Sequence, residues 1–184
     1  MPVNPPSCTL TTGTVPSMLS SMPSYRFTLL FALAPGEDST RLLDAFYENG
    51  CSDASFGVGT LGMLGGDFVR ASSSVAHAMS SACADVTRAV PHARLSLVEP
   101  WLGGMTQMAK ALHCTRQNVA KHIVGAFGKE GEAFPMPLYI GNPGLWRLDQ
   151  ALSWFVRNTA LRVDLNMLET CAEAARLMKD VARV

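Results

Sequence analysis

The stretch that decides the fold of the C-terminal half is residues 105–127, which read MTQMAKALHCTRQNVAKHIVGAF. Apolar residues recur in it at three- and four-residue spacing and predict two short helices packed against each other. The buried positions are Met108, Ala109 and Leu112 in the first helix and Val119, Ile123 and Phe127 in the second. His113 and Cys114 form the bend between the helices, and Thr115 is suited to cap the second one. This spacing is typical of a helix-turn-helix pair.

Long polar side chains occupy the other side of the predicted second helix. Arg116, Gln117, Asn118 and Lys121 project away from its buried stripe. Side chains with several hydrogen-bonding groups are the ones that read base edges in the major groove of DNA. We therefore expect Arg116, Gln117 and Lys121 to contact bases.

The following segment, residues 134–155, reads FPMPLYIGNPGLWRLDQALSWF and predicts a small wing. Two short strands are expected at 138–140 and 145–147, joined by a turn at 141–144. Asp149 is expected to cap a closing helix. That helix turns apolar residues back toward the helix pair, and two tryptophans anchor it: the set is Ala151, Leu152, Phe155, Val156, Trp146 and Trp154.

Taken together, these runs resemble the short bacterial helix-turn-helix regulators of the MerR-like or AlpA/excisionase-like winged type. The likeness covers about residues 104–157 and rests on M-A-x-x-L-x-x-T-R-Q-x-V from Met108, F-P-x-P from Phe134 and L-W-R-L-D from Leu145. It implies that the second helix reads the major groove and that the wing touches DNA near Tyr139 and Asn142. The residues expected to contact the DNA backbone are Lys110, Thr115, Asn118, His122, Tyr139, Asn142 and Arg147.

The N-terminal half predicts a different module, residues 25–100. Alternating apolar residues indicate strands at 25–33, 55–60, 63–69 and 94–99, and helical spacing indicates helices that begin near Ser39 and Ser73. Leu42, Leu43, Phe46 and Tyr47 are the expected buried positions of the first helix. The order strand, helix, strand, strand, helix, strand is typical of a ferredoxin-like βαββαβ domain. The predicted fold class is therefore α+β: this domain, then the winged domain at 101–160 and a C-terminal helix at 161–184.

Charge is divided unevenly between these parts. The chain has 15 basic and 15 acidic residues. Residues 101–162 nevertheless carry seven basic and three acidic residues, whereas residues 25–100 carry five basic and eight acidic ones. A neutral chain thus contains a basic module, which supports a nucleic-acid partner for that module.

The predicted C-terminal helix begins after Asp164 and carries an apolar stripe formed by Leu168, Cys171, Ala175 and Met178. The stripe is too short for an independent coiled coil. It could pack within the chain or pair two copies. We expect a homodimer, with this stripe or the outer face of the predicted sheet as the dimer surface.

Composition bounds the remaining possibilities. Residues 1–24 are rich in Ser, Thr, Pro and Met and predict a disordered tail, and the apolar run at 27–34 is too short to span a bilayer. Five widely spaced cysteines without a CxxC pair indicate free thiols in a cytoplasmic, reducing compartment and no metal site. No nucleophile-base pair or cofactor fingerprint is present, so we expect neither an enzyme nor a cofactor.

The expected function is a sequence-specific duplex-DNA-binding regulator. The alternative is a protein-interaction adaptor, such as an antitoxin or a phage-encoded accessory protein, whose ferredoxin-like domain binds a partner protein.

Overall fold

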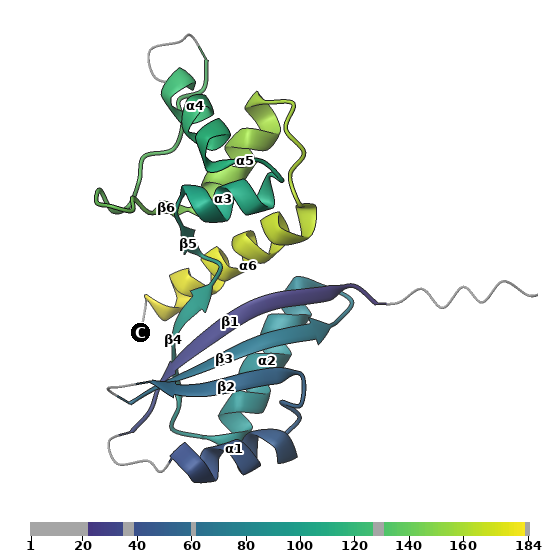
Figure 1. Ribbon diagram of the computed structural model, residues 1–184. Coiled ribbons are helices and arrows are strands. Elements are labelled where there is room, and N and C mark those ends of the chain that lie inside the picture. The colour runs from purple at the N-terminus through teal and green to yellow at the C-terminus, as the bar shows by residue number, and fades with distance from the viewer. Residues whose placement is uncertain (1–21, 35–38, 60–61, 127–130, 183–184) are drawn as a thin grey trace, which may run out of the picture.

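The computed structural model describes residues 22–34, 39–59, 62–126 and 131–182 (Figure 1). The expected disordered tail lies outside the described residues up to position 21, and Ser24 already belongs to the first strand. The chain is a mixed α+β protein, as the sequence predicts. No helix within the described ranges is long and apolar enough to cross a membrane.

The N-terminal half is a four-stranded antiparallel sheet covered by helices on one face (Figure 1). Its strands are β1 (Ser24–Ala32), β2 (Ala54–Gly59), β3 (Met63–Ala71) and β4 (Arg94–Glu99), in the order β2-β3-β1-β4. Helix α1 (Ser39–Glu48) joins β1 to β2, and helix α2 (Val75–Ala89) joins β3 to β4. In the view of Figure 1, α2 lies behind the sheet and α1 lies below it.

Alternation along the strands produces the core of this half. Every second residue of β1 is buried, and Leu29 has no exposed surface. Phe27 stacks on Phe68 of β3 with ring centroids 5.4 Å apart, and Phe46 of α1 stacks on Phe56 of β2 at 4.1 Å. Tyr47, which the helical spacing groups with Phe46, is instead 75% exposed, whereas Phe46 is buried.

A buried ion-pair network fastens the helix layer to the sheet. The Arg70 guanidinium donates to Asp53 at 2.7 Å and to Asp85 of α2 at 2.8 Å, and it also bonds the Ser81 hydroxyl at 2.9 Å. Burial alone would lower the pKa of Arg70, but the bonds to the two aspartates outweigh this and raise the pKa. The cation therefore stays charged where β3 meets α2.

The C-terminal half contains three helices around a second core. Helices α3 (Met105–Ala111) and α4 (Arg116–Ala126) are followed by α5 (Leu148–Asn158). A two-stranded ladder, β5 (Leu102–Gly103) with β6 (Trp146–Arg147), ties the start of this half to the start of α5. The expected strand at 138–140 is wrong: that segment makes only one isolated bridge, Tyr139 to Leu145, because residues 146–147 pair with β5 instead.

Two expectations about α5 need correction. Asp149 does not cap the helix, because α5 begins one residue before it and Arg147 holds the cap position. Asp149 instead lies in the first turn and accepts two hydrogen bonds from Arg147. Val156 is 47% exposed rather than turned toward α3 and α4, whereas Ala151, Leu152 and Phe155 are buried as expected.

Helix α6 (Leu165–Val181) lies between the two halves and belongs to both cores (Figure 1). Its N-cap is Asp164, as predicted, which accepts from the Met167 N–H at 3.1 Å. Cys171 is fully buried in the core of the C-terminal half, and Ala174 is fully buried in the core under the sheet.

The apolar stripe of α6 is therefore an intrachain packing surface. Cys171 and Ala175 are buried, and Leu168 and Met178 pack against the cores of the C-terminal and N-terminal halves respectively. Of the two possibilities that the sequence leaves open for these four residues, packing within the chain and pairing of two copies, the structure shows the first.

Candidate nucleic-acid interface

The turn between α3 and α4 sets the angle at which α4 is presented. His113 has a left-handed backbone, with φ of 49°, and the Cys114 N–H donates to the Ala109 carbonyl at 3.0 Å. The Thr115 hydroxyl then accepts from the Asn118 N–H at 3.2 Å, which confirms the predicted cap. A sharp bend between two short helices results.

The two helices of this pair share one small core. Met108 of α3 and Val119 of α4 have no exposed surface, and Ala109 and Ile123 are less than a tenth exposed. Phe127, the last expected buried position, lies outside the described residues. Because the buried side of α4 is fixed in this way, the opposite side of the helix must face solvent.

Long polar side chains lie on that solvent side, where the sequence places them. Arg116, Gln117 and Lys121 are all exposed. Within the described ranges, none of the three has a hydrogen bond or ion pair with another side chain of the protein. They occupy the first half of α4 and keep their hydrogen-bonding groups available for a ligand.

Some of the residues expected to contact the DNA backbone are exposed, whereas others are partly buried or already bonded within the chain. Lys110 and Thr115 are exposed, as are Tyr139 and Asn142 in the segment before β6. His122 and Asn118 are only half-buried positions on α4. The His122 ring meets Phe155 edge to face, with centroids 5.9 Å apart.

Arg147 is engaged within the chain and does not suit the phosphate-contacting role expected of it. Its guanidinium donates to both carboxylate oxygens of Asp149, at 3.1 and 2.6 Å, and both side chains are at least three-quarters buried. A DNA phosphate would have to compete with this bidentate pair.

The segment 134–145 projects beside the helix pair, at the left of Figure 1. The Leu145 N–H donates to Tyr139 at 3.0 Å, and the Leu138 N–H donates to Leu145 at 2.8 Å. Gly141 has the Tyr139 ring against it so closely that a Cβ there would overlap the ring. The side chains that the loop exposes are mostly apolar: Met136, Leu138, Tyr139 and Ile140.

A group of hydrogen bonds between Glu132 and α5, here called the Glu132 clamp, fixes the chain just before the segment 134–145. It was not predicted from the sequence. Glu132 accepts from Arg157 at 2.6 and 3.0 Å and from Asn158 at 2.9 Å, and its backbone carbonyl accepts from the Trp154 ring N–H at 2.8 Å. The hydrogen bonds from Arg157 and Asn158 lower the pKa of Glu132 to about 2. The partners are more than twenty residues apart in sequence, so no local pattern could indicate them.

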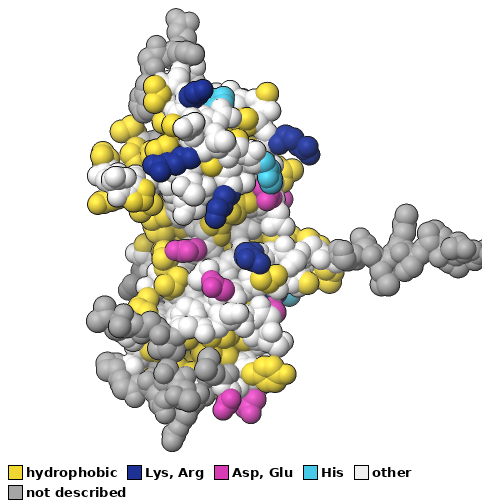
Figure 2. All heavy atoms as spheres, in the orientation of Figure 1, with side chains coloured by type: hydrophobic (Ala, Val, Ile, Leu, Met, Phe, Trp, Pro, Cys, Tyr) yellow, Lys and Arg dark blue, Asp and Glu magenta, His cyan; other side chains and the backbone are white. Residues whose placement is uncertain are grey.

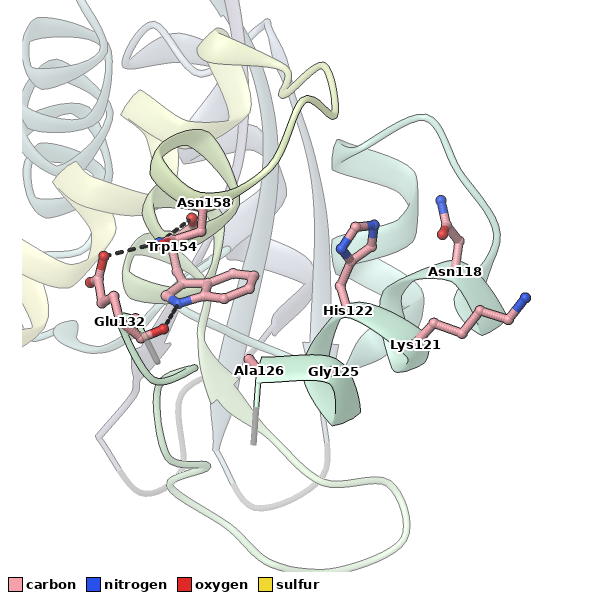
Figure 3. A pocket seen from close by; sticks show the side chains of 9 residues that line it. Asn118, Lys121, His122, Gly125, Ala126, Glu132, Trp154 and Asn158 are labelled. Atoms are coloured by element: carbon pink, nitrogen blue, oxygen red, sulfur yellow. Dashed lines mark hydrogen bonds between the residues drawn. The ribbon is translucent and has the colours of Figure 1, made fainter. Parts of the chain in front are cut away.

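A hollow of about 480 Å³ separates α4 from this clamp. Figure 3 shows Glu132, Trp154 and Asn158 on one wall and His122 of α4 on the other, and Asn118 and Lys121 of the same helix also line the hollow. Lys121 is exposed, so its amine is accessible to a ligand at this side of α4.

Basic and acidic side chains are distributed differently over the two halves of the molecule. In Figure 2 the Lys and Arg side chains spread over the C-terminal half, and Asp and Glu lie mainly at its junction with the sheet and below. Yellow apolar atoms gather at the margin where the segment 134–145 projects. No group of three or more His, Cys, Asp or Glu side chains able to hold a metal ion occurs among the residues that the structure describes.

Comparison with known proteins adds no assignment: no family model, no curated protein and no solved structure matches the chain.

Proposed function

We propose that the protein is a sequence-specific duplex-DNA-binding regulator without enzymatic activity. In this proposal the C-terminal half is a winged helix-turn-helix module, with α4 as the reading helix and residues 134–145 as a reduced wing. The N-terminal half is a ferredoxin-like module, a name that the strand order β2-β3-β1-β4 supports. The free cysteines at 51, 83, 114 and 171 are in keeping with a cytoplasmic protein.

One observation carries the proposal. Arg116, Gln117 and Lys121 lie exposed along the first half of α4, the second helix of a sharply bent pair, and the described chain gives them no side-chain partner. Residues at the N-terminal part of a second helix are the ones that reach base edges in the major groove. Arg and Gln offer the paired donors and acceptors that bidentate contacts to guanine and adenine require.

Two further features support a duplex partner. The positive charge gathers on this half, which attracts phosphate and makes binding salt-dependent. Lys110 and Thr115 flank the reading residues, where they can contact the backbone and set the register. In this proposal Tyr139 and Asn142 approach DNA from the wing.

The experiment begins with selection of bound sequences from a random duplex pool and continues with two matched variants. Arg116→Ala is expected to cost about 1–3 kcal/mol on the selected site and to relax preference at one base pair. Lys110→Ala is expected to weaken binding to all duplex sequences alike. It is also expected to lower the slope of the logarithm of the binding constant against the logarithm of the salt concentration by about one. Equal loss of sequence preference in both variants would contradict the assigned roles, and failure to enrich any sequence would contradict the function.

The adaptor function is the second candidate, and the open outer face of the sheet favours it. Val69 of β3 is 48% exposed there, and Gly57 of β2 has open space around it. Salt dependence separates the two functions. A DNA-binding protein loses affinity for duplex steeply between about 50 and 200 mM salt, whereas an adaptor shows no measurable duplex affinity at either salt concentration.

A homodimer completes the proposal. A module of this size reads only a few base pairs, and regulators reach useful specific affinity by placing two copies on neighbouring half-sites. The stripe on α6 is used within the chain, which leaves the sheet as the surface for pairing.

A further inference from the structure

The two edges of the four-stranded sheet differ in what covers them. At the β4 edge, the Val98 N–H points away from β1 and donates to the Met178 sulfur of α6 at 3.3 Å. Helix α6 therefore closes this edge. At the other edge, the described residues contain no strand that pairs with the free side of β2.

Register identifies the backbone groups that β2 leaves free. The Asp53 carbonyl accepts from the Val69 N–H at 3.0 Å, so residues 53, 55 and 57 turn their backbone groups toward β3. Ala54, Phe56 and Val58 consequently turn theirs outward. The Ala54 N–H already donates to the Cys51 carbonyl at 3.2 Å. Among the described residues, the groups left without a partner at the edge are the Ala54 carbonyl and both backbone groups of Phe56 and of Val58.

This edge also lacks the usual devices that prevent pairing. Exposed edges are normally blunted by Lys, Pro, an inward charge or a bulge. The β2 strand reads ASFGVG, with no charged residue and no proline, and its register with β3 is regular over all six residues. An unblocked strand edge of this kind is a surface on which another strand pairs.

We propose that β2 pairs antiparallel with β2 of a second copy of this chain, about a two-fold axis at Phe56. In this register the two Phe56 residues exchange both backbone hydrogen bonds. Each Val58 N–H donates to the Ala54 carbonyl of the other copy. The sequence of free groups is thus self-complementary, and the two sheets join into one continuous sheet. The inference deepens the homodimer part of the proposed function and does not depend on DNA binding.

The surroundings of the edge allow this approach. Ser55 and Gly57 are small and exposed on the outer face, and a Cβ at Gly57 meets nothing within 4 Å. On the other face, Phe46 holds α1 over β2 through its stack on Phe56.

Cysteine pairing tests the register directly. Across the proposed axis, Ser55 faces Gly57 of the other copy as a non-hydrogen-bonded pair, with Cα atoms about 4.5 Å apart. That separation suits a disulfide. The full chain carrying both Ser55→Cys and Gly57→Cys is expected to give a covalent dimer on a non-reducing gel after mild oxidation.

Each single variant is the matched control. A residue and its own copy are diagonal neighbours, about 7–8 Å apart, which is too far for a disulfide. Ser55→Cys alone, Gly57→Cys alone and the unaltered chain with its native cysteines are therefore expected to remain single chains on the gel. Cross-linking of a single variant as strong as that of the double variant would overturn the register.

A second variant keeps the inference testable if the double variant misfolds. Gly57→Lys adds a charge at the edge in open space, and Gly57→Ser is its neutral control. Light scattering across a dilution series is expected to show at least tenfold weaker dimerisation for Gly57→Lys and little change for Gly57→Ser. A dimer unaffected by Gly57→Lys would place the interface elsewhere, and an unaltered chain that is monomeric would overturn the homodimer. Duplex binding, measured separately, reports on the DNA-binding proposal alone.

Discussion

Replacing Phe155 by alanine tests whether the two halves of the chain are one cooperative unit. Phe155 has no exposed surface, and its ring meets Trp154, Phe134 and His122 edge to face at centroid distances of 5.3, 5.7 and 5.9 Å. Truncation of a buried phenylalanine costs about 3–5 kcal/mol. Because three ring contacts are lost along with the burial, we expect a loss of about 4 kcal/mol in the free energy of unfolding.

The variant should destabilise the N-terminal sheet as well as the C-terminal helices, because α6 is part of both cores. Urea unfolding measures it. With a slope of about 2 kcal/mol per molar, the midpoint shifts down by about 2 M. Trp101 packs against the N-terminal core, so the measurement is made in a Trp101→Phe background. In that background Trp146 and Trp154 make fluorescence report on the C-terminal half, whereas far-UV circular dichroism follows the whole chain. The two signals are expected to move together.

The neighbouring variant Val156→Ala serves as the control, since Val156 is 47% exposed and its truncation is expected to change stability by less than about 0.5 kcal/mol. A fluorescence transition that shifts while the circular dichroism transition splits in two or stays unchanged would refute the reasoning. That result would mean that α6 does not couple the halves.

Three further outcomes are expected. Arg70→Ala should lower the free energy of unfolding by about 3–5 kcal/mol in urea titration, because it leaves the partly buried Asp53 without its cation and Asp85 with only the exposed Arg88; a loss below about 1 kcal/mol would contradict the network's role. His113→Gly should raise the thermal midpoint, with a gain of about 1 kcal/mol, since glycine adopts the left-handed turn without strain; an unchanged or lower midpoint would argue against strain there. Stability should fall as pH rises above about 9, because burial raises the thiol pKa from 9.0 to about 11 in Cys51 and Cys83 and to about 12 in Cys171, so the unfolded chain ionises first; equal urea midpoints at pH 8 and pH 10.5 would contradict this.

Periodicity accounts for the parts of the fold that could be predicted from the sequence. The strand at 94–99 and the helix after Ser74 occur as their alternating and helical patterns indicate, because each pattern reports burial on one local face. The α3–α4 pair and the exposed side of α4 were predictable for the same reason. The spacing at Val119 and Ile123 fixes which residues turn outward.

The features that could not be predicted have a different cause: a local pattern does not show which distant segment a strand, helix or side chain will contact. Residues 145–147 look like a strand, but nothing local shows that 146–147 pair with β5 rather than with 138–140. The stripe on α6 is apolar whether a second copy or the chain's own cores cover it. Glu132 meets Arg157 only after the chain folds back. Such contacts depend on tertiary geometry that a single sequence does not display.

Closing one sheet edge with α6 has a consequence for how far assembly can proceed. A sheet open at both sides can add copies without end and grow into a fibre, whereas a sheet open only at β2 stops once a single copy has joined. In the proposed assembly, the contact between Met178 and Val98 therefore prevents further copies from pairing at the β4 edge. Removing α6 would leave the β4 edge unpaired as well. The shortened chain is therefore expected to precipitate as polymers rather than to remain a soluble dimer or monomer.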